Sequence, residues 1–256
     1  MNLGLKNKNV IVTGASRGIG FAIADSFLKE GAKVMLISRG SKLLDKAVFN
    51  LRDKYGDENV EKGLCDCSNE DALESLSKRI NEKWAKIDIV ISNVGDGKST
   101  NLPIPSDEEW KKSWSQNFES ALLTSRVFLP FLIKSKGCLL FISSIAGIEA
   151  FGAPVNYSTA KAAMIAFSKN LARKVANDVR VNVVAPGNVI FPGSSWDVKM
   201  QKNQLETLKL IDDSVPMKRF GKPDEIADAA VFICSSRAKF ITGSVLVVDG
   251  GQTVGV

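Results

Sequence analysis

The sequence predicts an α/β fold: a single Rossmann-type domain whose doubly wound parallel sheet is covered by helices on both faces. Three observations predict it. Short apolar runs alternate with longer segments of helical periodicity, a glycine-rich turn follows the first apolar run, and no linker rich in Pro, Gly or Ser divides the chain. The 256 residues suffice for one large domain, so we expect residues 1–256 to form it.

The N-terminal half supplies four of the expected strands. Asn9–Thr13 is a short apolar run bounded by Gly14, which is typical of a buried parallel strand. The helix that follows, residues 18–30, repeats its apolar residues at helical spacing and ends at Gly31. The same alternation predicts strands at 33–38, 60–65 and 88–92 and helices at 41–55 and 69–84.

The C-terminal half continues the alternation with longer helices. We expect strands at 138–143, 179–185 and 244–248 and helical regions at 106–134, 157–175 and 223–235. Strands separated by helices imply right-handed crossovers, and therefore a parallel sheet with helices on both faces.

The absence of histidine restricts the chemistry. It excludes Ser-His-Asp and Cys-His nucleophilic catalysis and any His-ligated metal site, so a general acid must be Tyr, Lys, Asp, Glu or Cys. The cysteines, Cys65, Cys67, Cys138 and Cys234, lack zinc-site spacing. We therefore expect buried free thiols and no metal.

Charge and hydropathy give weaker indications about partners and location. The net charge of +6 is scattered along the chain, which favours a lysine-rich solvated surface over an acidic partner. No basic stripe interleaved with aromatic residues indicates nucleic-acid binding. Without a recognisable signal peptide or an apolar run long enough to span a bilayer, we expect a cytoplasmic protein with no membrane partner.

Tyr157 and Lys161 form the first candidate chemical pair. Four residues apart on a helix, they share one face and can reach a common point. A free phenol has a pKa of roughly 10, and lowering it by about 3 units requires roughly 4 kcal/mol of differential interaction. A partly desolvated lysine, helped by a cationic cofactor, can supply most of this. The pair alone also fits an edge tyrosine and a solvated lysine on an ordinary helix.

Two further motifs accompany this pair. Residues 142–147, Ile-Ser-Ser-Ile-Ala-Gly, indicate a strand end that opens into a loop, with Ser144 thirteen positions before Tyr157. Residues 13–20, Thr-Gly-Ala-Ser-Arg-Gly-Ile-Gly, follow a strand and open a helix, and their glycines permit a tight turn and close approach to a pyrophosphate. In this order, the three motifs resemble the short-chain dehydrogenase/reductase family. The resemblance extends from about Lys6 to Gly251.

The resemblance implies roles for four side chains. Tyr157 would be the acid in carbonyl reduction and the base in alcohol oxidation, and Lys161 would lower its pKa and hold the nicotinamide ribose. Ser144 would hydrogen-bond the carbonyl oxygen, although Ser143 is also a candidate. Asn117 would anchor a water in a proton relay. Residues 1–256 would then form one dinucleotide-binding and catalytic domain.

The resemblance also implies NADP(H) as cofactor. The second strand ends in Ser38-Arg39 without the acidic residue that binds a ribose 2′-hydroxyl, and arginines at 17 and 39 suit a 2′-phosphate. The positions that match the family's cofactor contacts are Gly14, Ser16, Arg17, Gly18, Ile19, Gly20, Arg39, Asp66, Asn93, Gly95, Tyr157, Lys161, Pro186 and Gly187. Two positions depart from the family pattern: Val94 replaces an alanine, and Phe191 replaces a threonine that contacts the cofactor.

An irregular segment, residues 188–216, interrupts the alternation of strands and helices. Insertions of this length are usually functional. Four of its apolar residues fall near one face of a short amphipathic helix: Met200, Leu205, Leu208 and Ile211. We hypothesise that the segment is a substrate lid that closes over the nicotinamide pocket, with Phe151 and Trp196 lining the substrate site. The alternative is a surface helix with no role in binding.

The substrate and the assembly remain open at this stage. The pattern and length most resemble the 3-oxoacyl-[acyl-carrier-protein] reductases of fatty acid biosynthesis, with a sugar or sugar-nucleotide oxidoreductase as the alternative. A catalytically inert dinucleotide sensor is a remote alternative, because such proteins usually lack the Tyr or the Lys. Residues 117–134 are apolar over more than one helical stripe. Since the family pairs the corresponding helices between subunits, we expect a homotetramer or a homodimer.

Overall fold

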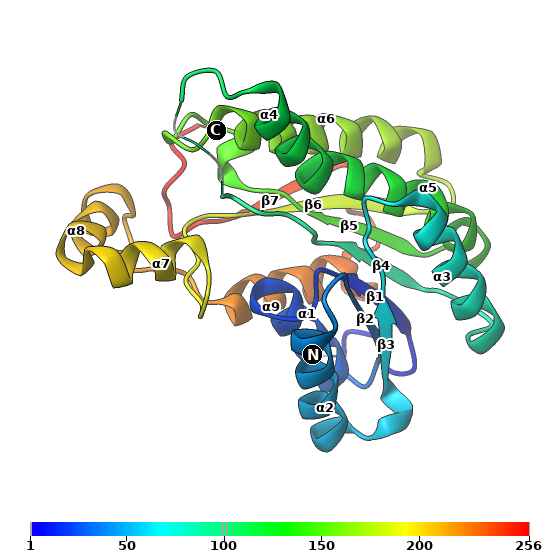
Figure 1. Cartoon of the computed structure of the whole chain (residues 1–256). Helices are drawn as coiled ribbons and strands as arrows, with labels where there is room; N and C mark the ends of the chain where they lie inside the picture. Colours follow the sequence, from blue (N-terminus) through cyan, green and yellow to red (C-terminus); the bar gives the residue numbers. More distant parts are fainter. Residues whose placement is uncertain (1, 99, 101, 256) are drawn as a thin grey trace.

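A parallel sheet forms the centre of the molecule. A computed structural model describes residues 2–98, 100 and 102–255, and within them the sheet has seven strands in the order β3-β2-β1-β4-β5-β6-β7 (Figure 1). The strands are β1 (Asn9–Thr13), β2 (Lys33–Ser38), β3 (Val60–Leu64), β4 (Ile89–Ser92), β5 (Cys138–Ile142), β6 (Arg180–Pro186) and β7 (Val245–Val248). Every pairing is parallel. The predicted Rossmann-type sheet is confirmed.

Helices cover both faces of the sheet, as Figure 1 shows. The helices are α1 (Gly18–Lys29), α2 (Ser41–Tyr55), α3 (Glu70–Lys83), α4 (Asp107–Trp114), α5 (Ser120–Ser135), α6 (Val155–Val175), α7 (Ser195–Lys202), α8 (Gln204–Ser214) and α9 (Pro223–Cys234). One core lies between the sheet and α1, α2 and α9, and a second between the sheet and α3, α5 and α6. Both faces of the inner strands are therefore buried, which explains why these strands are apolar runs rather than alternating patterns, whereas the edge strands β3 and β7 stay partly exposed.

Local signals set the helix boundaries. The Asn69 side chain accepts a hydrogen bond from the Ala72 amide and so begins α3. Ser106 and Glu109 form a capping box at the start of α4. Gly31, with a φ of 79°, takes the left-handed conformation that follows the end of α1. The predicted helical region 106–134 is two α-helices joined by a π-helical turn, Ser115–Glu119.

The carboxyl edge of the sheet carries the loops that matter for function. The chain winds outward in opposite directions from β1 and β4, and parallel sheets bind ligands in the crevice at such a switch point. Figure 1 shows α7 and α8 standing out from the body of the molecule beyond this edge. The segment 188–216 is thus placed next to the crevice rather than on the opposite edge.

The prediction of a single amphipathic helix in the segment 188–216 is wrong. Asn203 takes an extended conformation with φ −153° and ends α7, and its side chain then caps α8. Met200 and Leu205 consequently lie on different helices. Ile211 is buried at 2 % exposure, but Leu205 is 84 % exposed and Leu208 44 %. Asn203 lies in the middle of the apolar pattern and separates two helices, so the apolar residues do not share the single helical face that the pattern predicted.

The cysteines are buried and free, as predicted from their spacing. In the part of the chain that the structure describes, no helix combines the length and the apolar character needed to cross a membrane.

Candidate active site

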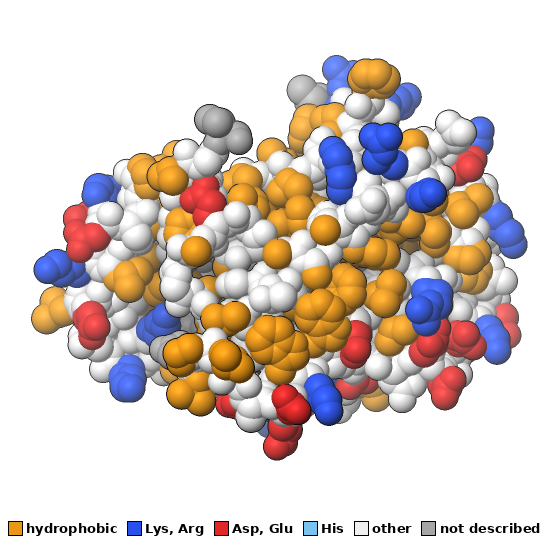
Figure 2. Space-filling view, turned by 90° about the horizontal axis from the view of Figure 1, so that it is seen from above, with side chains coloured by type: hydrophobic (Ala, Val, Ile, Leu, Met, Phe, Trp, Pro, Cys, Tyr) orange, Lys and Arg blue, Asp and Glu red, His pale blue; other side chains and the backbone are white. Residues whose placement is uncertain are grey.

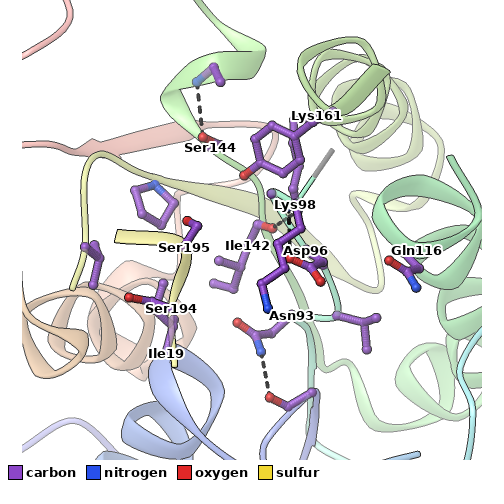
Figure 3. A pocket seen from close by; sticks show the side chains of 18 of the residues that line it. Ile19, Asn93, Asp96, Lys98, Gln116, Ile142, Ser144, Lys161, Ser194 and Ser195 are labelled. Atoms are coloured by element: carbon purple, nitrogen blue, oxygen red, sulfur yellow. Dashed lines mark hydrogen bonds between the residues drawn. The ribbon is translucent and has the colours of Figure 1, made fainter. Parts of the chain in front are cut away.

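A cleft of about 980 Å³ opens at the carboxyl edge of the sheet (Figure 3). This volume is at the upper end of the roughly 300–1,000 Å³ that ligand pockets occupy. Its walls come from the turns after β1, β2, β3, β4, β5 and β6, from the start of α6 and from the segment 188–216. Every residue predicted for the site lines this cleft except Gly18 and Asn117, which lie directly behind its wall.

Lys161 is the buried cation of the cleft. It is 3 % exposed, and its ammonium donates a hydrogen bond of 3.0 Å to the carbonyl of Ile142. Burial lowers the pKa of Lys161 to about 8. The ammonium lies 5.8 Å from the centroid of the Tyr157 ring. Because an ammonium has three donors, and the described residues engage one of them, Lys161 can also donate to a ligand.

Tyr157 lies beside Lys161 on α6 and is partly buried. Burial raises the pKa of its phenol, a hydrogen bond with Ser144 acts in the opposite direction, and the charge of Asp96 raises the pKa further. The lowered pKa expected from the sequence is therefore absent from the ligand-free chain. In the ligand-free chain, the Lys161 ammonium does not offset the burial of the phenol.

The two serines after β5 have different partners. The Ser143 hydroxyl is buried and donates to the carbonyl of Lys161 at 3.0 Å. The Ser144 hydroxyl accepts a hydrogen bond of 3.1 Å from the Ala146 amide and begins the 3₁₀ turn Ile145–Gly147. The Ser144 hydroxyl also hydrogen-bonds with the Tyr157 phenol in the cleft, whereas Ser143 supports the backbone of Lys161. This arrangement favours Ser144 over Ser143 as the hydroxyl that contacts the substrate.

Asn117 holds the loop after β4 in place. It is fully buried in the π-helical turn, and its amide nitrogen donates to the carbonyls of Asp96 and Ser113, each at 3.0 Å. Its carbonyl accepts from the Asp96 amide at 3.0 Å. A Cβ on Gly95 would lie 2.9 Å from both the Asn117 carbonyl oxygen and the Lys161 ammonium. Asn117, Gly95 and Lys161 therefore pack as one unit, with Asn117 behind the wall of the cleft.

The glycine-rich turn after β1 forms a cradle suited to a pyrophosphate. Gly14 has a φ of 63°, and a Cβ on Gly20 would lie 2.5 Å from the Asn93 amide nitrogen. The same nitrogen donates to the carbonyls of Thr13 and Gly14 and so fixes the turn. No side chain among the described residues caps the N-terminus of α1. Its free N–H groups and the positive end of its dipole suit a phosphate group.

Two arginines lie at the far end of this cradle. Arg39 is exposed at the end of β2, and its charge contributes to the lowered pKa of Asp66, which a hydrogen bond from Ser68 lowers more strongly. Arg17 donates a hydrogen bond of 3.1 Å to the carbonyl of Gly193. The arginine of the turn is thus tied to the segment 188–216. With no carboxylate at the end of β2, this part of the cleft suits an anionic group on a ribose.

Aromatic residues form the opposite side of the cleft. Trp196 packs against Phe220 with ring centroids 5.4 Å apart, and the Lys199 ammonium lies 4.3 Å from the Trp196 ring centroid. Phe151 and Trp196 both line the cleft. A Cβ on Gly18 would lie 2.5 Å from the ring of Phe191, so the phenylalanine that replaces the family's threonine packs against the glycine turn.

The polar residues of the cleft wall that the sequence did not single out include Asp96, Lys98, Gln116 and Gln252. Figure 3 shows Asp96 and Lys98 beside Asn93 and Lys161. Their position directly after Gly95 was the only available signal. Gln252 follows the Asp249-Gly250-Gly251 turn, and no motif distinguished it. In the described residues, no group of three or more Cys, Asp or Glu side chains is placed to hold a metal ion.

Comparison with known proteins gives consistent similarities over the whole chain. A family model described as enoyl-(acyl carrier protein) reductase matches residues 14–253. The 3-oxoacyl-[acyl-carrier-protein] reductase FabG of Chlamydia muridarum is 37 % identical over 98 % of this chain and 100 % of its own. The short-chain dehydrogenase/reductase SDRA of Arabidopsis thaliana is 36 % identical over 97 % of this chain and 95 % of its own.

Among solved structures, L-sorbose reductase from Gluconobacter frateurii, in complex with NADPH and L-sorbose, is similar to the whole chain. The TM-score is 0.93 at 30 % identity, and the match covers 100 % of both chains.

Proposed function

Because the chain belongs to the short-chain dehydrogenase/reductase family, we propose that Ser144, Tyr157 and Lys161 carry out its interconversion of a carbonyl and a secondary alcohol. Bound NADPH supplies the hydride to the carbonyl carbon. One observation carries the proposal. The uncapped N-terminus of α1, which suits a pyrophosphate, lies in the same cleft as Ser144, Tyr157 and Lys161.

The side chains supply the proton and the polarisation. The Ser144 and Tyr157 hydroxyls donate hydrogen bonds to the carbonyl oxygen, which withdraws electron density from the carbon that accepts the hydride. The Tyr157 proton passes to that oxygen, so the product is a neutral alcohol and a phenolate remains on Tyr157. Lys161 stabilises this phenolate as a buried ammonium. In the direction of oxidation the same groups act in reverse, with the phenolate as base.

The cofactor end of the cleft supports NADP(H) over NAD(H). Arg39 and Arg17 provide cationic donors where a 2′-phosphate would lie, and β2 ends without a carboxylate that would repel it. The L-sorbose reductase of the same fold binds NADPH.

Two substrate classes fit the reaction. The curated relatives are named 3-oxoacyl-[acyl-carrier-protein] reductases, which supports a carrier-linked acyl substrate. The polar lining of the substrate side, with Asp96, Gln116 and Ser195, supports a polyhydroxylated ketone, and the similar L-sorbose reductase was solved with such a ligand. An inert sensor is disfavoured because the reactive set is complete.

A broad apolar surface supports assembly into a homodimer or homotetramer. Figure 2 looks onto the helical layer that contains α4 and α6, where apolar side chains gather over the middle of the face. On α5 and α6, seven apolar side chains are only partly buried in the single chain: Leu122, Leu123, Val127, Leu129, Phe131, Phe167 and Leu171. A helix that is apolar beyond its core stripe buries a second face against a partner. We infer that a second copy covers α5 and α6.

The segment 188–216 is proposed as a lid. Trp196 and Val198 of α7 and Leu210 and Ser214 of α8 line the cleft, so parts of both helices face the substrate side. The hydrogen bond from Arg17 to the Gly193 carbonyl connects the start of the segment to the cofactor cradle. Binding of a phosphate by Arg17 would therefore alter its contact with the Gly193 carbonyl, and through this contact cofactor binding would order the lid.

Substitution Tyr157→Phe removes only the hydroxyl that donates the proton. We expect kcat to fall by about two orders of magnitude or more, with the affinity for NADPH nearly unchanged. Oxidation of NADPH with an acetoacetyl thioester and with L-sorbose measures the rate, and fluorescence titration measures the affinity. Tyr55→Phe, which alters the only other tyrosine, is the control. A Tyr157→Phe enzyme that kept a tenth of its activity would identify a different acid.

Substitution Arg39→Asp places a carboxylate where the 2′-phosphate would lie. A lost charge-assisted contact is worth about 1.5–3 kcal/mol, so we expect the affinity for NADPH to fall at least tenfold and that for NADH to stay or improve. Arg237→Asp, on the exposed turn after α9, is the control. Equal affinity of the unaltered protein for both cofactors contradicts the assignment.

Assembly is expected to depend on the α5 face. Sedimentation velocity at micromolar concentration should give a dimer or a tetramer for the unaltered chain. Leu123→Lys, which places a charge on the apolar face, should shift the distribution toward smaller species, whereas Phe49→Lys on α2 should not. A stable monomer of the unaltered chain would rule out this assembly.

Closure of the lid is expected to slow amide exchange across residues 188–216. Hydrogen exchange is compared for the free chain, the NADPH complex and the complex of NADP⁺ with a substrate alcohol. Residues 57–59, a 3₁₀ turn far from the cleft, serve as an internal reference. Unchanged exchange in the ternary complex would remove the lid from the mechanism.

A further inference from the structure

Two free cysteines contact each other at the amino edge of the sheet, opposite the cleft. Cys138 is the first residue of β5, and Cys234 is the last residue of α9. Their sulfur atoms lie 3.8 Å apart, and the two thiols form a hydrogen bond. Both residues are buried, at 3 % and 5 % exposure. The fold thus holds in contact two thiols that are 96 residues apart in the sequence.

A guanidinium group is fixed beside this pair. Arg180 is the residue of β6 that pairs with Cys138 in the register of the sheet. Its guanidinium donates hydrogen bonds of 2.8–3.3 Å to four carbonyls around the end of α9, those of Ile233, Cys234, Ser235 and Ile241. These contacts hold a positive charge close enough to act on both thiols.

The surroundings make the two thiols chemically different. The pKa of the Cys138 thiol is lowered by its hydrogen bond with Cys234 and by the charge of Arg180, which together outweigh the effect of burial. Burial and the hydrogen bond with Cys138 raise the pKa of the Cys234 thiol well above its ordinary value. The thiolate is the nucleophile in cysteine oxidation. Cys138 is therefore suited to attack, and Cys234 retains its proton and is suited to resolve the product.

A second cavity, of about 200 Å³, adjoins the pair at the amino edge. Both cysteines line it, together with Arg180, Lys8 and Asp88. A water molecule occupies roughly 30 Å³ of liquid, so a cavity of this volume has room for a molecule as small as hydrogen peroxide. Neither Cys138 nor Cys234 lines the large cleft at the carboxyl edge. The pair is thus separate from the site that binds cofactor and substrate.

We propose that Cys138 and Cys234 are a modification site, which hydrogen peroxide oxidises to a reversible intramolecular disulfide. First, the Cys138 thiolate attacks a peroxide oxygen and the O–O bond breaks. This gives a sulfenic acid and a hydroxide, which takes up the proton that Cys138 released. The Cys234 sulfur then attacks the Cys138 sulfur, the S–O bond breaks, and the thiol proton leaves with the hydroxide as a second water. The pair loses two electrons, and peroxide gains them.

The bond would close a loop that contains the reacting groups. Ser144, Tyr157 and Lys161 all lie between Cys138 and Cys234 in the sequence. Because the two sulfur atoms are already in contact, the bond needs only a small shift of the chain. A disulfide across a loop of this length restricts the unfolded chain strongly and so stabilises the folded chain. Oxidation is therefore expected to make the protein more resistant to unfolding.

The experiment treats the reduced, unaltered chain with millimolar hydrogen peroxide in the absence of denaturant. Mass spectrometry of non-reduced peptides should find a pair linked through Cys138 and Cys234, and dithiothreitol should reverse the link by thiol–disulfide exchange. The thermal midpoint of the linked chain should exceed that of the reduced chain by at least about 5 °C. Cys138→Ala and Cys234→Ala should each abolish the link and the shift, whereas the matched control Cys65→Ala should keep both.

Contrary results would overturn the inference. A link that forms only in denaturant, a link that involves Cys65 or Cys67, or irreversible oxidation of Cys138 without a link would show that the pair does not react in this way in the folded chain. A linked chain whose midpoint is not raised would rule out the stabilising effect. The unaltered chain decides these points even if an alanine variant fails to fold. The measurements need neither NADPH nor a carbonyl substrate, so they test the inference independently of the proposed function.

Discussion

The burial of the Lys161 ammonium beside the phenol of Tyr157 is the constraint on which the rest of the site depends. A buried charge is stable only where polar groups surround it, and the Ile142 carbonyl provides one partner at 3.0 Å. The segments of the chain that surround this ammonium are arranged to accommodate it. Gly95 has no side chain that would displace it, and the Ser143 hydroxyl supports the backbone of Lys161. The lowered pKa of Lys161, about 8, measures the cost of this burial. A phenolate on Tyr157 and a bound anionic ligand would both reduce that cost.

The parallel sheet brings together groups that are distant in the sequence. The turns after β1, β4, β5 and β6 end at one edge, so the phosphate cradle, Gly95, Ser144 and Gly187 meet in a single cleft. Secondary contacts then fix the loops. Asn117 holds the turn after β4 from behind, and Asn93 ties it to the cradle after β1. The loop after β4 is thus anchored both to the cradle after β1 and to the π-helical turn.

Much of this could be predicted from the sequence because the signals are local. The alternation of strand and helix segments located all seven strands to within one residue, and the spacing between Ser144, Tyr157 and Lys161 reflects one strand, one turn and one helix. The features that could not be predicted depend on contacts that a short sequence pattern does not reveal. Asn203 divides α7 from α8 by a capping bond inside an apolar pattern, and the π-helical turn at Asn117 has no sequence signature. Gln252 lines the cleft only because of the fold, since no motif marks it in the sequence. The raised pKa of Tyr157 likewise follows from the burial of its phenol, which the spacing of residues in the sequence does not reveal.

The central claim is that Tyr157 becomes a proton-transfer group only when the charge of the cofactor joins that of Lys161. The chain has two tyrosines, so a Tyr55→Phe variant labelled with ¹³Cζ-tyrosine reports the ionisation of Tyr157 alone by NMR. The account predicts a pKa above the ordinary value of about 10 in the free protein, and a value well below it with NADP⁺ bound. Replacing Lys161 by methionine should remove most of that decrease. A pKa of Tyr157 that is the same with and without NADP⁺ would contradict the account.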